Sequence, residues 1–213
     1  MNADEHEVRA RVVAAARRLR ELGLNPGRSG NASARFGSGF LVTPSGLAYD
    51  RMEPADLAFV EIDGGAARGA RRPSSEWRLH RDLYASRPEA GGIAHTHSPF
   101  ATTLACLRRP IPAFHYEVAF LGGADLRCAE YATFGTQSLS DHALAALAGR
   151  RACLLANHGA IAAGASVEEA VELAERVEAL ARVYWQALQA GEPVLLDEVE
   201  MAQVLEKFRA YGK

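Results

Sequence analysis

Apolar residues recur every three or four positions in several stretches of the chain, which is the spacing of an amphipathic helix. The first stripe follows Asp4, a candidate N-cap, and ends at Gly23. The longest stripe begins after Ser166 and runs to about Ala190. Four shorter helices are predicted: one through Tyr84 with a serine cap at 74–75, one over 99–107, one capped by Ser140 or Asp141 and ending at Gly149, and one over 198–211.

Short apolar runs bounded by turn residues predict strands between these helices. They lie at 40–42, 57–62, 91–97, 152–156 and 160–163, and the sequence Asp63-Gly64-Gly65 is typical of a hairpin turn. Strands and helices are interleaved without a regular alternation, and this favours a mixed sheet covered by helices over a purely parallel fold. With 213 residues, 48% of them hydrophobic, the chain is large enough for one sizeable core, so we expect a single domain over 1–213.

Composition narrows the classes of function. The formal net charge is -2 and basic residues form no broad clustered face, which argues against a nucleic-acid partner. No apolar run approaches the ~20 residues that span a bilayer, so no membrane association is expected. The polar, acidic N-terminus lacks the pattern of a signal peptide, and three distant cysteines suit a reducing compartment. These features predict a cytoplasmic protein.

Three histidines are the strongest candidates for chemistry. His95 and His97 follow an apolar run and lie two apart, so on a strand both side chains would point to the same face. His158 follows a second apolar run, in Asn157-His158-Gly159. Three neutral imidazoles with one open position describe a catalytic zinc site, although other divalent first-row metals also suit them. Two core histidines and a turn histidine would give the same pattern, so the neighbouring motifs matter.

Three loops rich in glycine, serine and asparagine are candidates for binding a phosphate, because small residues let backbone amides approach an anion. They are Ser29-Gly30-Asn31-Ala32-Ser33, Thr43-Pro44-Ser45-Gly46 and Ser74-Ser75. Each loop alone is also typical of an ordinary turn or cap, and none has a nucleotide-binding pattern. Glu76, directly after the serine pair, is either a general acid/base beside a metal or a helix residue that complements the dipole.

The chain contains five short motifs in this order: SGNAS, TPSG, PSSE, HTH and NHG. Together they closely resemble the class II aldolase/adducin family, most of all its fuculose-phosphate aldolase branch. The resemblance runs from the first helix to about Tyr184 and includes 111–116 and 130–136. It implies a three-layer α/β/α fold with a mixed, largely antiparallel central sheet. It also implies a homotetramer whose active sites lie at subunit interfaces.

The resemblance also assigns roles to residues. It implies Zn²⁺ bound by His95, His97 and His158, and a substrate phosphate bound by Gly30, Asn31, Ser45, Gly46, Ser74 and Ser75. Glu76 matches the catalytic carboxylate, and Tyr116 matches a tyrosine that acts at a neighbouring subunit's site. Tyr211 is matched to a C-terminal tyrosine of the aldolases, in a tail that aligns poorly.

The implied activity is cleavage of a ketose 1-phosphate to dihydroxyacetone phosphate and an aldehyde. L-Fuculose 1-phosphate, 5-deoxyribulose 1-phosphate and 5-methylthioribulose 1-phosphate are the candidate substrates. Two enzymatic alternatives remain: a sugar-phosphate 4-epimerase, whose motif resembles PSSD where this chain has Glu76, and a methylthioribulose-1-phosphate dehydratase, whose catalytic glutamate matches Glu117. The complete set of three histidines with Glu76 argues against a non-enzymatic, adducin-like module.

Overall fold

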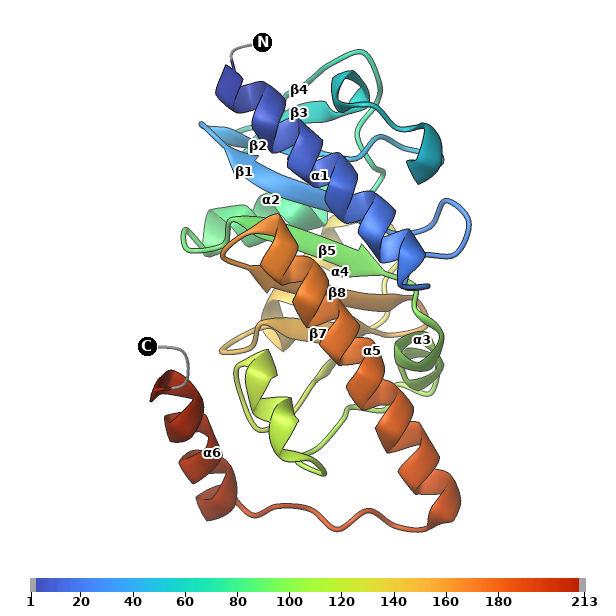
Figure 1. Cartoon of the computed structure of the whole chain (residues 1–213), viewed down its shortest axis with the longest axis vertical. Helices are drawn as coiled ribbons and strands as arrows, with labels where there is room; N and C mark the ends of the chain where they lie inside the picture. Colours follow the sequence, from blue (N-terminus) through green and yellow to red (C-terminus); the bar gives the residue numbers. More distant parts are fainter. Residues whose placement is uncertain (1–2, 211–213) are drawn as a thin grey trace.

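A mixed β-sheet forms the centre of the computed structural model, which describes residues 3–210 (Figure 1). In this part of the chain eight strands follow the order β4-β3-β2-β1-β5-β8-β7-β6. Neighbouring strands are antiparallel except for the parallel pair β6 and β7, so the predicted mixed, largely antiparallel sheet is confirmed. The strands are β1 (Asn31–Phe36), β2 (Gly39–Val42), β3 (Ala58–Glu61), β4 (Ala67–Arg68), β5 (Gly92–Thr96), β6 (Cys128–Ala129), β7 (Ala152–Leu155) and β8 (Gly159–Gly164).

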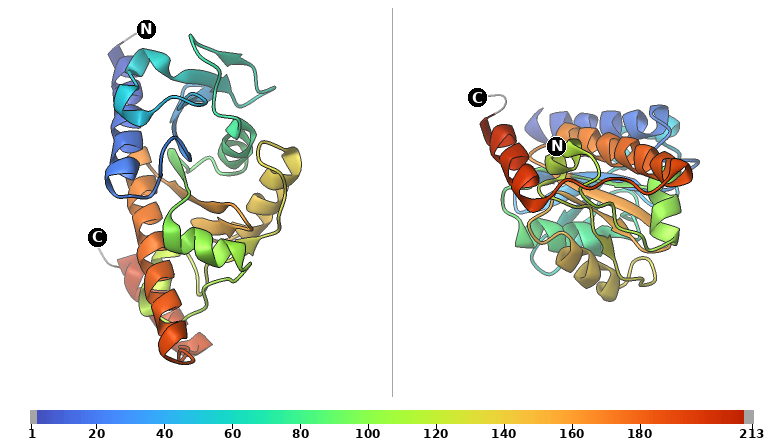
Figure 2. Two further views of the ribbon diagram at one scale, coloured as in Figure 1. Left: turned by 90° about the vertical axis from the view of Figure 1, so that its right-hand side faces the viewer. Right: turned by 90° about the horizontal axis from the view of Figure 1, so that it is seen from below.

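Helices cover both faces of this sheet, which confirms the three-layer α/β/α fold (Figure 2). One layer contains α1 (Ala3–Glu21) and α5 (Val167–Ala190), and α3 (Pro99–Cys106) packs against α5. The opposite layer contains α2 (Trp77–Ser86) and α4 (Gln137–Ala146). A last helix, α6 (Glu198–Ala210), packs beside the 3₁₀ helix η3 (Tyr116–Leu121), and two short 3₁₀ helices, η1 (Tyr49–Arg51) and η2 (Pro54–Asp56), follow β2. Within the described residues, no helix is long and apolar enough to cross a membrane.

The alternation of side chains along β5 divides the core into two layers. Ala94 lies in the apolar cluster under α1 and α5, whereas Ile93 lies in the cluster under α2 and α4. Gly92 lets the start of α5 approach the sheet closely, because a Cβ at this position would lie only 2.2 Å from the backbone nitrogen of Val167. Because His95 lies two residues after Ile93 on β5, it shares the face of Ile93, which is the face covered by α2 and α4.

Some helix starts differ from the sequence-based prediction. Helix α1 already includes Asp4 in its first turn, so Asp4 is not its cap. Helix α4 is capped by Thr136, whose hydroxyl accepts a hydrogen bond from Leu139 N at 3.3 Å, so the predicted caps Ser140 and Asp141 lie inside the helix. Thr136 satisfies the free N–H groups one turn earlier than the alanine-rich pattern indicated.

The start of α2 is also different, and this difference concerns the site. The N-cap position belongs to Glu76 rather than to a serine, and the Glu76 side chain makes no capping hydrogen bond. Ser74 lies just before, and its Oγ accepts from the Glu76 backbone nitrogen at 3.3 Å. The carboxylate of Glu76 is thereby free to point away from its own helix. The predicted cap of α5 is confirmed, since Ser166 Oγ accepts from Glu169 N at 3.2 Å.

Candidate active site

The three predicted histidines converge. His95 and His97, at the end of β5, have ring centroids 4.8 Å apart, and their Nε2 atoms are separated by 2.9 Å. His158 comes from the turn between β7 and β8, where Asn157 adopts a left-handed backbone conformation with φ of 55°. Its ring lies 4.7 Å from that of His95 and 4.9 Å from that of His97. Side chains from two distant parts of the sequence thus meet at one point.

Glu76 completes this cluster from the start of α2. Its Oε2 lies 3.1 Å from His95 Nε2, and its Oε1 lies 3.3 Å from His158 Nε2. One donor atom from each of the four residues falls within 4.8 Å of the others. Oε1 is buried and has no hydrogen-bond partner among the described residues, so it has an unused lone pair directed at the cluster. Three imidazoles and one such carboxylate suit a divalent metal ion.

Hydrogen bonds from outside the cluster orient the histidines. The carbonyl oxygen of Ala160 lies 2.9 Å from His95 Nδ1, and because a carbonyl can only accept, Nδ1 carries a hydrogen and Nε2 is the nitrogen that faces the cluster. Asn25 holds the end of β5 with its side-chain amide. Its Nδ2 donates to His95 O at 3.3 Å, and its Oδ1 accepts from His97 N at 3.2 Å.

The pKa values of Glu76 and of two of the histidines favour the binding of a cation. Burial, reinforced by the charge of His95, lowers the pKa of His97 to about 3 and that of His158 to about 4. Burial also opposes protonation of His95, but the Glu76 carboxylate outweighs it and raises the His95 pKa. Burial alone would raise the pKa of Glu76, yet the neighbouring histidines bring it well below its usual value. Glu76 is therefore ionised, and His97 and His158 are neutral, near pH 7.

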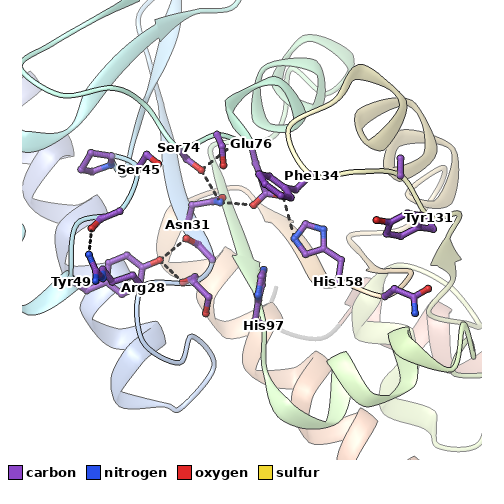
Figure 3. Close-up of a pocket in the computed structure, with 17 residues that line it drawn as sticks. Arg28, Asn31, Ser45, Tyr49, Ser74, Glu76, His97, Tyr131, Phe134 and His158 are labelled. Carbon is purple, nitrogen blue, oxygen red and sulfur yellow. Dashed lines mark hydrogen bonds and ion pairs between the residues drawn. The ribbon is translucent and has the colours of Figure 1, made fainter.

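A pocket of about 350 Å³ opens beside the cluster (Figure 3). Its lining includes every residue predicted to bind phosphate, together with most of the metal cluster: Gly30, Asn31, Ser45, Gly46, Ser74, Ser75, Glu76, His97 and His158. His95 lies behind this surface and is fully buried. The structure therefore brings the three candidate phosphate loops and the histidines to one cavity.

Glycine is required at position 30 of this cavity. The backbone φ of Gly30 is +71°, and a Cβ there would lie 2.4 Å from the side-chain atoms of Asn25. The Tyr49 hydroxyl holds the same loop, since its single hydrogen is shared between Gly30 O at 2.7 Å and Ser29 O at 2.9 Å. The loop is thus held close to the end of β5.

The sequence interpretation missed several residues of the pocket: Arg28, Tyr49, Tyr131, Phe134 and Asn157. Arg28 links two loops, because its Nη1 donates to Gly46 O at 3.0 Å, and it brings a positive charge to the pocket. A signal was available for Arg28, which directly precedes the Ser29-Gly30 motif. The aromatic pair lies in the stretch 130–136, which the family resemblance included without assigning a role to either ring.

Two further candidates, Tyr116 and Glu117, lie outside this pocket. Tyr116 and Glu117 begin η3, and neither is among the described residues that line the cavity. Tyr116 is 49% exposed and stacks on Phe208 of α6, with ring centroids 6.2 Å apart. Tyr211 lies outside the described residues.

Comparison with known proteins agrees with this geometry. Residues 10–185 match the family model described as class II aldolase and adducin N-terminal domain. A 5-methylthioribulose-1-phosphate/5-deoxyribulose-1-phosphate aldolase of Rhodospirillum rubrum is 55% identical, over 94% of this chain and 90% of its own. An L-fuculose phosphate aldolase of Escherichia coli O6:H1 is 42% identical, over 98% and 97% of the two chains. A solved L-fuculose 1-phosphate aldolase superposes with a TM-score of 0.92 at 39% identity, covering 98% of both chains. The chain therefore belongs to the class II aldolase and adducin family, and it is a metal-dependent aldehyde-lyase.

Proposed function

We propose that the enzyme cleaves 5-methylthioribulose 1-phosphate and 5-deoxyribulose 1-phosphate between C3 and C4, giving dihydroxyacetone phosphate and an aldehyde. The polarity of the pocket carries this proposal. In Figure 3, Arg28 and Ser45 lie on one side of the two labelled histidines and Tyr131 lies on the other, while Phe134 is drawn close to Glu76 and His158. Such a pocket suits a ketose with an anionic end at C1 and an apolar group at C5. The name of the Rhodospirillum rubrum relative supports the same pair of substrates.

The phosphate is proposed to bind at the three small-residue loops. Gly30, Ser45, Gly46, Ser74 and Ser75 line one region of the pocket, and the serine pair immediately precedes the N-terminus of α2. Unpaired N–H groups and the positive end of the helix dipole favour an anion at such a place. Arg28 adds a formal positive charge, which strengthens hydrogen bonds to phosphate oxygens.

We further propose that the metal is Zn²⁺, bound by His95, His97 and His158, with Glu76 as a fourth donor until substrate arrives. When bound, the cation supplies Lewis-acid stabilisation of negative charge on the substrate oxygens. Side chains of the protein carry out the proton transfers. In condensation the ionised Glu76 takes a proton from C3. In cleavage Glu76 gives C3 the proton that the C4 hydroxyl has released, as the bond between C3 and C4 breaks.

Cleavage also requires the C4 hydroxyl to lose its proton, and we assign this step to Tyr116 of a neighbouring subunit. The position of Tyr116 supports the assignment, because the side chain is half exposed and outside the pocket of its own chain. We therefore propose a homotetramer with shared sites, and Glu117, next to Tyr116 on η3, is brought to the same interface. We also propose that the enzyme is cytoplasmic, because its three cysteines are free thiols, which suit a reducing compartment.

Shared sites can be tested by mixing two inactive variants. Tyr116→Phe and His95→Ala each disable a different part of the site. Oligomers assembled from both would contain some sites with an intact Tyr116 and an intact histidine cluster, so activity should return. If mixed oligomers stay inactive while each variant alone assembles normally, the shared site is refuted.

The reaction itself can be tested with the purified zinc-loaded enzyme and a panel of ketose phosphates that includes L-fuculose 1-phosphate. Release of dihydroxyacetone phosphate, with highest kcat/KM for the 5-methylthio and 5-deoxy substrates, supports the proposal. Loss of water without carbon–carbon cleavage would instead identify a dehydratase. Interconversion of two ketose phosphates without release of dihydroxyacetone phosphate would identify an epimerase.

A further inference from the structure

A chain of buried hydrogen bonds leads from the interior of the α2 layer to the pocket. The Tyr84 hydroxyl lies 2.9 Å from Ser33 Oγ, which lies 2.6 Å from His80 Nδ1. On the other side of the ring, His80 Nε2 lies 2.5 Å from Asn31 Oδ1. All four side chains are buried, and neither His80, Ser33 nor Tyr84 has a part in the proposed reaction.

The direction of donation along this chain is fixed from its pocket end. An amide nitrogen can only donate, so the hydrogen bond of 3.0 Å between Asn31 Nδ2 and Glu76 Oε2 is donated by Asn31. The amide oxygen of Asn31 then faces His80 and must receive a hydrogen from Nε2. A neutral imidazole carries one hydrogen, so Nδ1 accepts from Ser33, and Ser33 accepts from Tyr84. Burial, together with the charge of His95, lowers the pKa of His80 to about 3, so the ring is neutral.

The same amide also orients a serine that lines the pocket. The second hydrogen of Asn31 Nδ2 goes to Ser74 Oγ at 3.0 Å, and the backbone nitrogen of Glu76 donates to that oxygen at 3.3 Å. Ser74 Oγ therefore accepts twice, and its own hydrogen stays available to donate into the pocket. If the Asn31 amide were reversed, its oxygen would face Glu76 Oε2 with no hydrogen between two acceptors.

We propose that His80 is a positioning residue of the active site, which acts through Asn31 to orient both the Glu76 carboxylate and the Ser74 hydroxyl. This inference rests on the proposed aldolase function. A donor at the position of His80 Nε2 holds the amide of Asn31 in one orientation. Glu76 Oε2 then keeps a donor while it lies beside His95, Oε1 lies beside His158, and Ser74 remains a donor toward a bound phosphate.

The test uses two matched substitutions, His80→Gln and His80→Asn. Both replace a buried neutral ring by a smaller neutral amide, and asparagine is smaller than glutamine by one methylene, so His80→Asn costs more in packing. The amide nitrogen of glutamine reaches the position of imidazole Nε2 and can donate to Asn31, whereas that of asparagine reaches only the position of Nδ1. A merely structural role predicts that the two variants differ in thermal stability but have equal kcat and equal phosphate affinity, whereas a positioning role predicts that only His80→Gln retains function. Thermal stability and bound metal are measured for both variants.

For the zinc-loaded enzyme we expect kcat of His80→Asn to fall about 10- to 100-fold below that of His80→Gln, the usual effect of a lost outer-shell partner. Inorganic phosphate, measured by calorimetry, should bind His80→Asn more weakly. Equal kcat and equal phosphate affinity in the two variants would overturn the inference. If the wild type releases no dihydroxyacetone phosphate, the proposed function fails, and phosphate affinity alone then decides whether His80 orients Ser74.

Discussion

The substitution Gly30→Ala tests how tightly the loop at Gly30, part of the proposed phosphate site, is coupled to β5, which carries His95. Gly30 has a φ of +71°, and an added Cβ would lie 2.4 Å from the Nδ2 and Oδ1 atoms of Asn25. Those atoms hold the carbonyl of His95 and the backbone nitrogen of His97. A methyl group in the loop would therefore displace the amide that fixes the end of β5.

The magnitude follows from these contacts. An alanine in the left-handed region costs about 1–2 kcal/mol relative to glycine. Loss of the two Asn25 hydrogen bonds adds about 1 kcal/mol for each bond. We expect the free energy of unfolding to fall by about 3–4 kcal/mol in total. Because the displaced backbone carries His95 and His97, metal affinity should fall as well, by about 10- to 100-fold.

Gly23→Ala is the matched control. Its φ is +72°, but an added Cβ would meet nothing within 4 Å, so only the conformational cost of about 1–2 kcal/mol applies. Urea denaturation at fixed zinc concentration and competition with a chromogenic chelator measure the two quantities. Equal losses of stability in both variants, with metal affinity unchanged in Gly30→Ala, would refute the coupling through Asn25.

Four further predictions concern the site itself. His95→Ala should abolish activity and reduce bound metal, as measured by turnover and elemental analysis; near-normal turnover would contradict the assigned centre. Glu76→Gln should retain metal and fold but lose about 10²- to 10⁴-fold in kcat, the range for a positioned acid/base group. Arg28→Ala should raise KM for sugar phosphates more than it lowers kcat, and an unchanged KM would remove Arg28 from the phosphate site. The pKa of His80 lies at about 3, below its ordinary value of 6.5, so between these values the unfolded chain binds more protons. The free energy of unfolding should therefore fall as pH falls through this window, by about 1.4 kcal/mol per pH unit for such a group. Urea denaturation at several pH values measures this dependence, and the free energy of unfolding of His80→Gln should fall less steeply as pH falls.

The metal cluster could be predicted from sequence because strand geometry is a local property. A spacing of two places His95 and His97 on the same side of β5 whatever the rest of the fold does. The position of His158 depends on pairing between β5 and β8, and here the family resemblance supplied what periodicity alone could not. Glu76 was found by the same resemblance, since an acidic residue at a helix start is otherwise ordinary.

The contribution of Asn25 could not be predicted in this way. In the sequence, Asn25 precedes Pro26-Gly27 and is simply typical of the end of a helix. Its role comes from contacts with residues about 70 positions later, and no local pattern encodes them. Tyr116 shows a related limit, because it is half exposed and does not line the pocket of its own chain.

Asn31 shows that a motif can identify the residues of a site without showing which hydrogen bonds each side chain makes there. The sequence placed Asn31 among the phosphate-binding residues, and it does line the pocket. However, both hydrogens of its side-chain amide are donated within the protein, to Ser74 and to Glu76, and its oxygen accepts from His80. Any contact of Asn31 with a phosphate must therefore come from its main chain, whereas the Ser74 hydroxyl still has a hydrogen to donate. Donor-rich residues mark where an anion can bind, but the internal hydrogen bonds decide which donors remain for it.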